Sequence, residues 1–283
     1  MSRRYAGAVF DRLLGALDGW RLCVITGAGI STDSGIPDYR GPNAPTRRPI
    51  TYQQFIGDPE LRRRYWARNH LGWRHMDAAR PNAGHRALAG LERAGIVDAV
   101  ITQNIDLLHT KAGSRRVIDL HGTYARVRCL TCGALISRAA LDDRLEHANP
   151  GFSDTAVASR GVQTAPDADA VLTITGEFRM VDCEICGGIL KPDFVYFGES
   201  VPKPRVASAF SLVDEAQALL VAGSSLTVMS GLRFVRHAAK REIPIVIVNR
   251  GPTRGDELAT LTLHAGCSEA LSALLAASPV APA

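Results

Sequence analysis

Leu22-Cys-Val-Ile-Thr-Gly-Ala-Gly29 is the stretch of sequence that decides the fold. Its first five residues carry no charge and include three β-branched side chains in a row, a pattern typical of a buried strand in a parallel sheet. Gly27 and Gly29 follow at once, and glycines there let backbone amides approach a phosphate group at the start of a helix. The stretch predicts a nucleotide-binding strand and turn, although its spacing departs from Gly-x-Gly-x-x-Gly.

Three further apolar runs resemble this first strand, and a helix-like segment precedes each of them. They are Ala99–Thr102, Ala218–Ala222 and Ile245–Asn249. Strands that alternate with helices predict a parallel α/β sheet, and such sheets bind ligands at the carboxyl ends of their strands. We therefore expect a Rossmann-like, doubly wound sheet with its ligand site just beyond these runs.

Four cysteines form two Cys-x-x-Cys pairs, Cys129 with Cys132 and Cys183 with Cys186, separated by 50 residues. Two such pairs predict one tetrahedral Zn²⁺ site, and four thiolates leave no open position for catalysis, so the zinc should be structural. Free thiols or a redox pair are the alternative, which the doubled spacing disfavours. Cys23 and Cys267 lie outside the pattern.

The segments that interrupt the strand–helix rhythm predict a second, smaller domain. We expect residues 1–41, 82–120 and 191–283 to form the Rossmann-like domain. A helical insertion at 42–81 and a zinc-binding insertion at 121–190 would together form the small domain.

Composition narrows the classes of function. The 283 residues carry a net charge of only +5, and their arginines are scattered, so nucleic-acid binding is not favoured. No run reaches the roughly 18 apolar residues that span a bilayer, and no secretion signal is visible. Paired cysteines suit a reducing compartment, and we expect a cytoplasmic protein without membrane contact. Nothing in the sequence indicates an oligomeric state.

Polar residues follow two of the predicted strands. Gln103, Asn104 and Asp106 come directly after the second strand and could reach a ribose or an amide in the ligand crevice. His121 follows another short run, Val117–Leu120, at the junction with the zinc insertion. An imidazole at that position is a candidate general base, although a single histidine after a strand is more often an ordinary polar residue.

The chain resembles the sirtuins, the NAD-dependent protein-lysine deacylases, through motifs that occur in the family's order. These are GAGISTDSGIPDYRG at 27–41, TQNID at 102–106, HG at 121–122, the two cysteine pairs, KPDFVYFGE at 191–199, GSSLTV at 223–228 and VNRG at 248–251. Residues 65–69, 109–116 and 249–253 are most similar to class II sirtuins. Only four of the 33 basic residues are lysines, which is typical of a GC-rich bacterial genome.

The resemblance implies a mechanism in which NAD is consumed. The carbonyl oxygen of the acyl-lysine would attack C1′ of the nicotinamide ribose and expel nicotinamide. His121 would then deprotonate a ribose hydroxyl, and water would finally release free lysine and O-acyl-ADP-ribose. Asn104 would hold the ribose or an ordered water, and Asp106 with Ile105 would hold the nicotinamide carboxamide, so that His121, Asn104 and Asp106 form the catalytic group.

The resemblance also implies the remaining contacts with NAD, in which Tyr39 would cover the reacting carbon against water. The full set of implied NAD-binding residues is Gly27, Ala28, Gly29, Ser31, Thr32, Asp38, Tyr39, Arg40, Gln103, Asn104, Ile105, Asp106, Gly223, Ser224, Ser225, Asn249, Arg250 and Cys267.

An acyl-lysine peptide would bind as an added strand between the segments Val195–Glu199 and Ser225–Val228, mainly through backbone hydrogen bonds. In an extended run, Val195 and Phe197 would lie beside the lysine stem. Gly198, Glu199 and Val228 complete the implied peptide contacts.

Tyr65 and Arg68 are spaced like a pair that binds succinyl-lysine in some sirtuins. The alternative is that both belong to a helix packed on the core, with Trp66 buried and Arg68 reaching water. Two other functions stay open: ADP-ribosyl transfer to a protein at the same NAD site, and a non-catalytic sensor of NAD or ADP-ribose.

Overall fold

The computed structural model describes residues 11–39, 49–153 and 177–278, which form two compact units. The first unit comprises the described parts of residues 1–35, 80–120 and 201–283, and the second those of residues 36–79 and 121–200. The boundaries expected from the sequence differ mainly at residues 191–200. These residues group with the second unit because the strand Leu190–Phe194 pairs with a strand of that unit.

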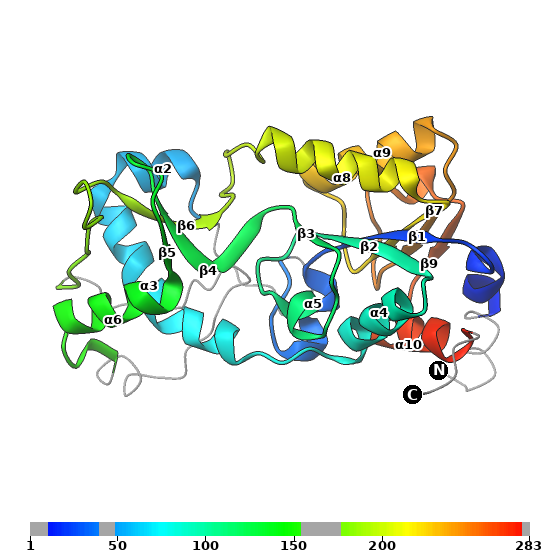
Figure 1. The fold of residues 1–283 in the computed structure, drawn as a ribbon, viewed down its shortest axis with the longest axis horizontal. Helices are drawn as coiled ribbons and strands as arrows, with labels where there is room; N and C mark the ends of the chain where they lie inside the picture. The colour runs from blue at the N-terminus through cyan, green and yellow to red at the C-terminus, as the bar shows by residue number, and fades with distance from the viewer. Residues whose placement is uncertain (1–10, 40–48, 154–176, 279–283) are drawn as a thin grey trace. The chain divides into compact units, whose positions relative to one another are not determined.

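A parallel sheet of six strands forms the first unit (Figure 1). Its order is β3-β2-β1-β7-β8-β9, and every neighbouring pair is parallel. The strands are β1 (Leu22–Thr26), β2 (Val97–Thr102), β3 (Val117–Asp119), β7 (Ala218–Ala222), β8 (Ile245–Val248) and β9 (Leu261–Leu263). The chain adds strands on one side of β1 and then on the other, which creates the switch point of a doubly wound sheet between β1 and β7. The predicted fold class is confirmed.

Helices cover both faces of this sheet, with α8 (Lys203–Glu215) and α9 (Met229–Lys240) on one side and α4 (Ala83–Arg93) and α10 (Cys267–Ala276) on the other (Figure 1). Side chains alternate along β1 to serve both layers. Leu22 and Val24 pack in a core cluster with residues of α4 and α10, whereas Cys23 and Ile25 pack with residues of α8 and α9. Both faces are buried, which explains why β1 is uninterrupted by charge.

Shorter elements complete the first unit. Residues 11–17 are helical, and the short helices η1 (Ala28–Ile30), η2 (Thr32–Ser34), α5 (Leu108–Lys111) and η3 (Asp256–Leu258) follow strand ends or connect them.

The second unit contains a three-stranded antiparallel sheet of order β5-β4-β6. Its strands are β4 (Gly122–Cys129), β5 (Leu135–Ser137) and β6 (Leu190–Phe194), and its helices are α2 (Tyr52–Gly57), α3 (Pro59–Ala78) and α6 (Arg138–Ala148). A smaller module with helices and the cysteine pairs was predicted, and the structure confirms it.

A buried arginine joins α3 to α6. The guanidinium of Arg138 lies 4.8 Å from the ring centroid of Trp73, donates to Asn69 Oδ1 at 3.2 Å and lies 3.5 Å from Asp142 Oδ1. Only 2% of Arg138 is exposed. Buried charge of this kind needs partners on several sides, and α3 and α6 supply them.

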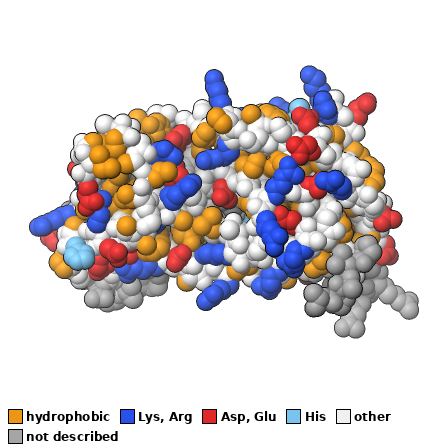
Figure 2. Space-filling model, in the orientation of Figure 1, with side chains coloured by type: hydrophobic (Ala, Val, Ile, Leu, Met, Phe, Trp, Pro, Cys, Tyr) orange, Lys and Arg blue, Asp and Glu red, His pale blue; other side chains and the backbone are white. Residues whose placement is uncertain are grey.

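No helix in the described ranges has the length and the apolar character needed to cross a membrane. On the face drawn in Figure 2, basic side chains are interspersed with acidic ones and do not gather in a single stripe.

Candidate active site

The glycine loop after β1 packs directly on the loop after β7, at the switch point of the sheet. Gly29 N donates to Gly223 O at 2.8 Å. A Cβ at Gly29 would lie 2.8 Å from Gly223 O, and one at Gly27 would lie 2.8 Å from Ser224 Cβ, closer than real Cβ contacts allow. The two loops can approach this closely only because side chains are missing. This is the position at which doubly wound sheets bind nucleotides.

Ser31, Asn104 and Asp106 form a hydrogen-bonded group at the ends of β1 and β2. Ser31 Oγ donates to Asp106 Oδ2 at 2.7 Å, and Leu108 N donates to Asp106 Oδ1 at 2.9 Å. Asn104 Nδ2 donates to Ser31 Oγ at 3.0 Å and to Gly27 O at 3.1 Å. Asp106 is buried, and burial raises its pKa, whereas the hydrogen bond from Ser31 lowers it.

Two buried histidines lie beside this group, and sequence reasoning did not single them out. His109 Nε2 lies 2.9 Å from Thr26 Oγ1, and its ring centroid lies 4.8 Å from that of His85. Burial lowers the pKa of His85 to about 4 and lowers that of His109 well below its usual range, so both rings are neutral at pH 7. Asn82 N donates to His85 Nδ1, which leaves the hydrogen on Nε2, 3.5 Å from Ser31 Oγ.

Gln103 links the end of β2 to the loop after β7. Its backbone N donates to Thr26 O at 2.9 Å, and its Nε2 donates to Ser224 Oγ at 2.7 Å. Ser225 Oγ lies 3.1 Å from Thr227 Oγ1 in the same loop. The carboxyl ends of β1, β2 and β7 are thereby joined through side chains that the sequence predicted to meet NAD.

The end of β8 and the start of α10 contribute the remaining predicted residues of this unit. Arg250 Nη2 lies 3.4 Å from Asp33 Oδ1, and Ser268 Oγ donates to Asp33 Oδ2 at 2.7 Å. Asn249 Nδ2 donates to Gly251 O. Cys267 is the first residue of α10, and its sulfur lies close to Gly223 in the loop after β7: a Cβ added to Gly223 would be 3.0 Å from Cys267 Sγ. Asp33 was not predicted, because nothing in its local sequence indicates that two distant segments bond to it.

Other predicted residues belong to the second unit. Tyr39 is 40% exposed, and its ring meets that of Phe197 edge-on at 6.0 Å between centroids. His121 is half-buried, and its backbone O accepts from Val195 N at 2.7 Å. Asp38 is half-buried as well, and Arg40 lies outside the described residues.

The segment expected to receive a peptide is not extended throughout. Glu199 N donates to Tyr196 O at 3.0 Å, so the chain turns at Gly198 instead of continuing β6. Tyr52 N donates to Phe197 O at 2.9 Å, and Gln53 Nε2 donates to Gly198 O at 3.2 Å. The first residues of α2 therefore already occupy two backbone oxygens of the segment that was expected to bind the peptide. In the first unit, Val228 is the residue that precedes α9.

Tyr65 lies within an aromatic cluster of the second unit. None of its side chain is exposed, and its ring contacts those of Phe55, Trp66 and Tyr196 at 5.4, 5.6 and 5.6 Å between centroids. Asn69 Nδ2 donates to its hydroxyl at 3.2 Å. Arg68 is half-buried on the same helix. This environment favours the packing alternative for Tyr65, and a role of the pair in acyl binding stays a prediction.

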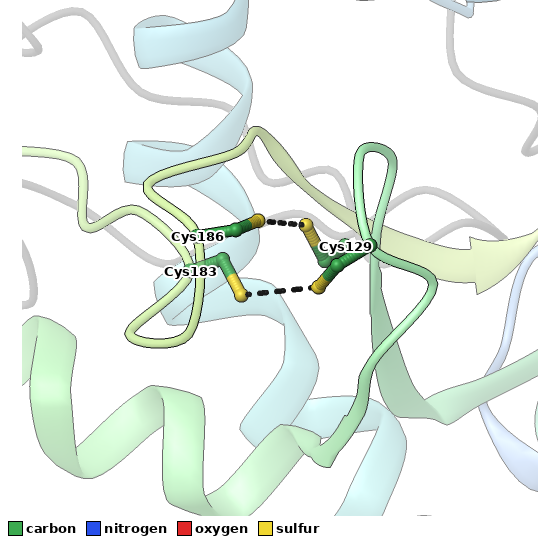
Figure 3. A group of neighbouring side chains, drawn as sticks. Cys129, Cys183 and Cys186 are labelled. Carbon is green, nitrogen blue, oxygen red and sulfur yellow. Dashed lines mark hydrogen bonds between the residues drawn. The ribbon is translucent and has the colours of Figure 1, made fainter.

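The four paired cysteines converge to form a metal site (Figure 3). Their Sγ atoms all lie within 4.8 Å of one another, with Cys129 and Cys186 at 3.5 Å and Cys132 and Cys183 at 3.8 Å. Four thiolates about 2.3 Å from a tetrahedral Zn²⁺ would be separated by about 3.8 Å, so the arrangement fits this ion.

Backbone groups support the cysteine cluster. Thr131 N donates to Cys129 Sγ at 3.4 Å, and a Cβ on Gly188 would lie 2.9 Å from that same sulfur. Among the described residues, no other group of histidine, cysteine and acidic side chains has such spacing. The predicted convergence of the four cysteines is confirmed, and this closed set of thiols is consistent with a structural zinc that leaves no position for a substrate.

Comparisons with known proteins agree with this architecture. The family model described as Sir2 family matches residues 27–230. The chain is 67% identical over 262 residues to NAD-dependent protein deacetylase 1 of Mycobacterium avium (strain 104), with 93% of each chain covered. It is 56% identical over 246 residues to NAD-dependent protein deacetylase 1 of Streptomyces coelicolor, covering 86% of this chain and 81% of the relative.

Solved structures give the same result. A structure of Sir2 with a p53 peptide and NAD⁺ superposes with a TM-score of 0.72 at 31% identity, covering 93% of this chain and 95% of that one. A second Sir2 enzyme structure has a TM-score of 0.75 at 29% identity, covering 95% and 97%. From its motifs, its sheet, its cysteine cluster and these similarities, the chain belongs to the Sir2 family.

Proposed function

We propose that this protein is an NAD-dependent protein-lysine deacetylase that converts an acetyl-lysine peptide and NAD into nicotinamide, free lysine and O-acetyl-ADP-ribose. The observation that carries the proposal is 67% identity, over 93% of the chain, to a relative named as an NAD-dependent protein deacetylase. The hydrogen-bonded group of Ser31, Asn104 and Asp106 at the carboxyl ends of β1 and β2 supports the same activity.

NAD is a co-substrate in this proposal, and its phosphates would bind at the glycine loop. Gly27 and Gly29 leave backbone amides accessible where β1 ends. Asn104 directs its Nδ2 at Ser31 and Gly27, so its Oδ1 is the atom we expect to accept from a ribose hydroxyl or an ordered water. Asp106 is held from two sides, which suits a carboxylate that must keep one orientation toward the nicotinamide amide.

In the proposed reaction the acetyl oxygen attacks C1′ of the ribose, and the bond to nicotinamide breaks. His121 then removes the proton of a ribose hydroxyl, whose oxygen attacks the imidate carbon. Addition of water to that carbon releases the lysine amine, and the acetyl group remains on the sugar. His121 must be neutral to act as this base.

The four-cysteine site would hold zinc through Cys129, Cys132, Cys183 and Cys186 and would contribute folding energy to the second unit. The bound ion would be saturated by thiolates. None of the catalytic steps above needs it.

Several finer assignments stay predictions. They are the peptide as an added strand beside Val195, Phe197 and Val228, the class II assignment, the cytoplasmic location and the choice of acyl group. We expect acetyl to be preferred over succinyl, because Tyr65 is fully buried among aromatic rings.

The test is to incubate the purified protein with an acetyl-lysine peptide and NAD labelled in the adenylate moiety. Free lysine peptide and labelled O-acetyl-ADP-ribose in solution would support deacetylation. Label retained on protein would support ADP-ribosyl transfer, and unchanged NAD would support a sensor.

His121→Tyr should abolish product formation, because tyrosine cannot act as the base at neutral pH. His147→Tyr is the matched control: His147 is exposed on α6, and its Nδ1 lies 2.6 Å from Asp143 O of its own helix. Full activity in His121→Tyr would show that the assigned base is wrong.

A further inference from the structure

The segment from Leu190 to Glu199 contains a buried lysine. Lys191 is 4% exposed, and its Nζ donates to Pro192 O at 3.1 Å, to Phe194 O at 2.5 Å and to Glu199 Oε2 at 3.1 Å. An ammonium group has three hydrogens, and these three acceptors use all of them. All three acceptors come from the eight residues that follow Lys191, so the segment is wrapped around its charge.

Aromatic rings enclose the same ammonium group. Lys191 Nζ lies 4.7 Å from the ring centroid of Tyr196 and 6.0 Å from that of Phe194. Burial lowers the pKa of Lys191, while the charge of Glu199 raises it in opposition. A buried lysine keeps its proton only with such partners, so the pair depends on both charges.

Glu199, at the other end of the segment, bonds back to Lys191 and to Tyr196. Its Oε2 accepts from Tyr196 N at 2.9 Å as well as from Lys191 Nζ, and its own N donates to Tyr196 O at 3.0 Å. The carboxylate therefore points into the protein. The direct peptide contact that the sequence implied for Glu199 stays a prediction.

The ion pair thereby sets the shape of the segment that carries Val195 and Phe197. Phe197 is 42% exposed, and its backbone O is held by Tyr52 N. Its side chain projects from a turn whose two sides are held by Glu199 and by the start of α2. A change at Lys191 would release the first of these two supports and leave the second.

We propose that Lys191 is a positioning residue for the acetyl-lysine peptide, acting through Glu199 to hold Val195–Glu199 in the conformation that receives the substrate. The proposal rests on the deacetylase function proposed above. As a positioning residue, Lys191 contacts neither the peptide nor NAD. Its loss should therefore weaken peptide binding and leave NAD binding largely intact, because most of the predicted NAD contacts, the glycine loop and Asn104 among them, belong to the other unit.

The main test compares Lys191→Met, Lys191→Arg and the control Lys240→Met, which removes an exposed lysine at the end of α9. Methionine keeps the length and apolar stem but removes the charge. We expect the peptide Kd of Lys191→Met, measured by fluorescence anisotropy without NAD so that no turnover occurs, to rise by about tenfold or more, with the NAD Kd within about twofold of wild type. Arginine should restore most of the peptide affinity, because it keeps the charge and the donors.

Glu199→Gln gives a second test that keeps an oxygen for Tyr196 N but removes the negative charge. Hydrogen exchange of the Tyr196 amide should accelerate in Lys191→Met and in Glu199→Gln, and it should not change in Lys240→Met. If Lys191→Met does not fold, Glu199→Gln and Lys191→Arg decide the question by the same two measurements.

Unchanged peptide Kd and unchanged Tyr196 exchange in Glu199→Gln, or equal losses of peptide and NAD affinity, would overturn the proposal. A wild-type protein that binds the peptide but releases no acetyl group would refute the deacetylase function instead. The affinity and exchange measurements need no turnover, so they would still decide the role of Lys191.

Discussion

Gly122 follows the proposed base His121, and replacing it with alanine tests the backbone geometry of β4 sharply. Its φ is +88°, and an added Cβ would collide with Asp193 O and lie 2.8 Å from Phe194 Cα. These atoms belong to the backbone of β6, which pairs with β4 at this position. No side chain can rotate away to make room, so the strands must separate locally.

The expected cost has two parts. A non-glycine residue in the left-handed region costs about 1–2 kcal/mol, and overpacking costs about 1–3 kcal/mol more. Gly122→Ala should therefore lower the free energy of unfolding by about 2–5 kcal/mol and the Tm by on the order of 10 °C. It should also reduce deacetylation, because His121 O accepts from Val195 N and must move with the strand.

Gly95→Ala is the control for the conformational part. Gly95 has a φ of +74°, and a Cβ there would meet nothing within 4 Å. Thermal denaturation of both variants, followed by circular dichroism, separates the two contributions. Equal losses of stability in Gly122→Ala and Gly95→Ala would refute the claim that β6 blocks a side chain at position 122.

Two further predictions concern the metal site and the buried histidines. Cys132→Ser should contain no zinc and be less stable, because three thiolates cannot close the site. The control Cys23→Ala changes a cysteine outside the cluster and should retain one zinc per chain. Elemental analysis of the purified variants measures the zinc content. Burial lowers the pKa of His85 from 6.5 to about 4. As the pH falls, the unfolded chain therefore binds a proton at this residue before the folded chain does. The stability that depends on neutral His85 is fully present above pH 6.5 and is lost as the pH falls toward 4. Between pH 7 and pH 5 the wild-type protein should lose about 2 kcal/mol of its free energy of unfolding through this residue. In urea denaturation, the free energy of unfolding of His85→Gln should therefore fall by about 2 kcal/mol less than that of wild type over the same pH range. An identical decline in wild type and variant would contradict the neutral state of His85.

The central strands could be predicted from the sequence to within a residue or two. Leu22–Thr26 and Ala218–Ala222 match β1 and β7, because strands buried on both faces consist of uninterrupted apolar residues. β9 was missed, since Leu261–Leu263 is a three-residue edge strand with too short a pattern to stand out. The antiparallel pairing of β4 with β6 was missed too, because it joins segments separated by the second cysteine pair and the long stretch before it.

The zinc ligands depended only on local spacing, and the structure brings the four sulfurs together as predicted. Asn104 and Asp106, predicted NAD-binding residues of the first unit, were identified by their position after a strand, and they lie together there. Their catalytic roles stay predictions.

Other properties were decided by tertiary structure. Tyr65 and Arg68 have the same spacing in a binding pair and in a packed helix, and only the rings of Phe55 and Tyr196 show that Tyr65 is buried. The inward direction of Glu199 depends on Lys191, and the neutral state of His85 depends on the burial that the surrounding chain provides. Strand patterns and metal ligands were readable from the sequence because they depend on neighbouring residues, whereas burial, side-chain direction and pKa depend on partners that only folding brings together.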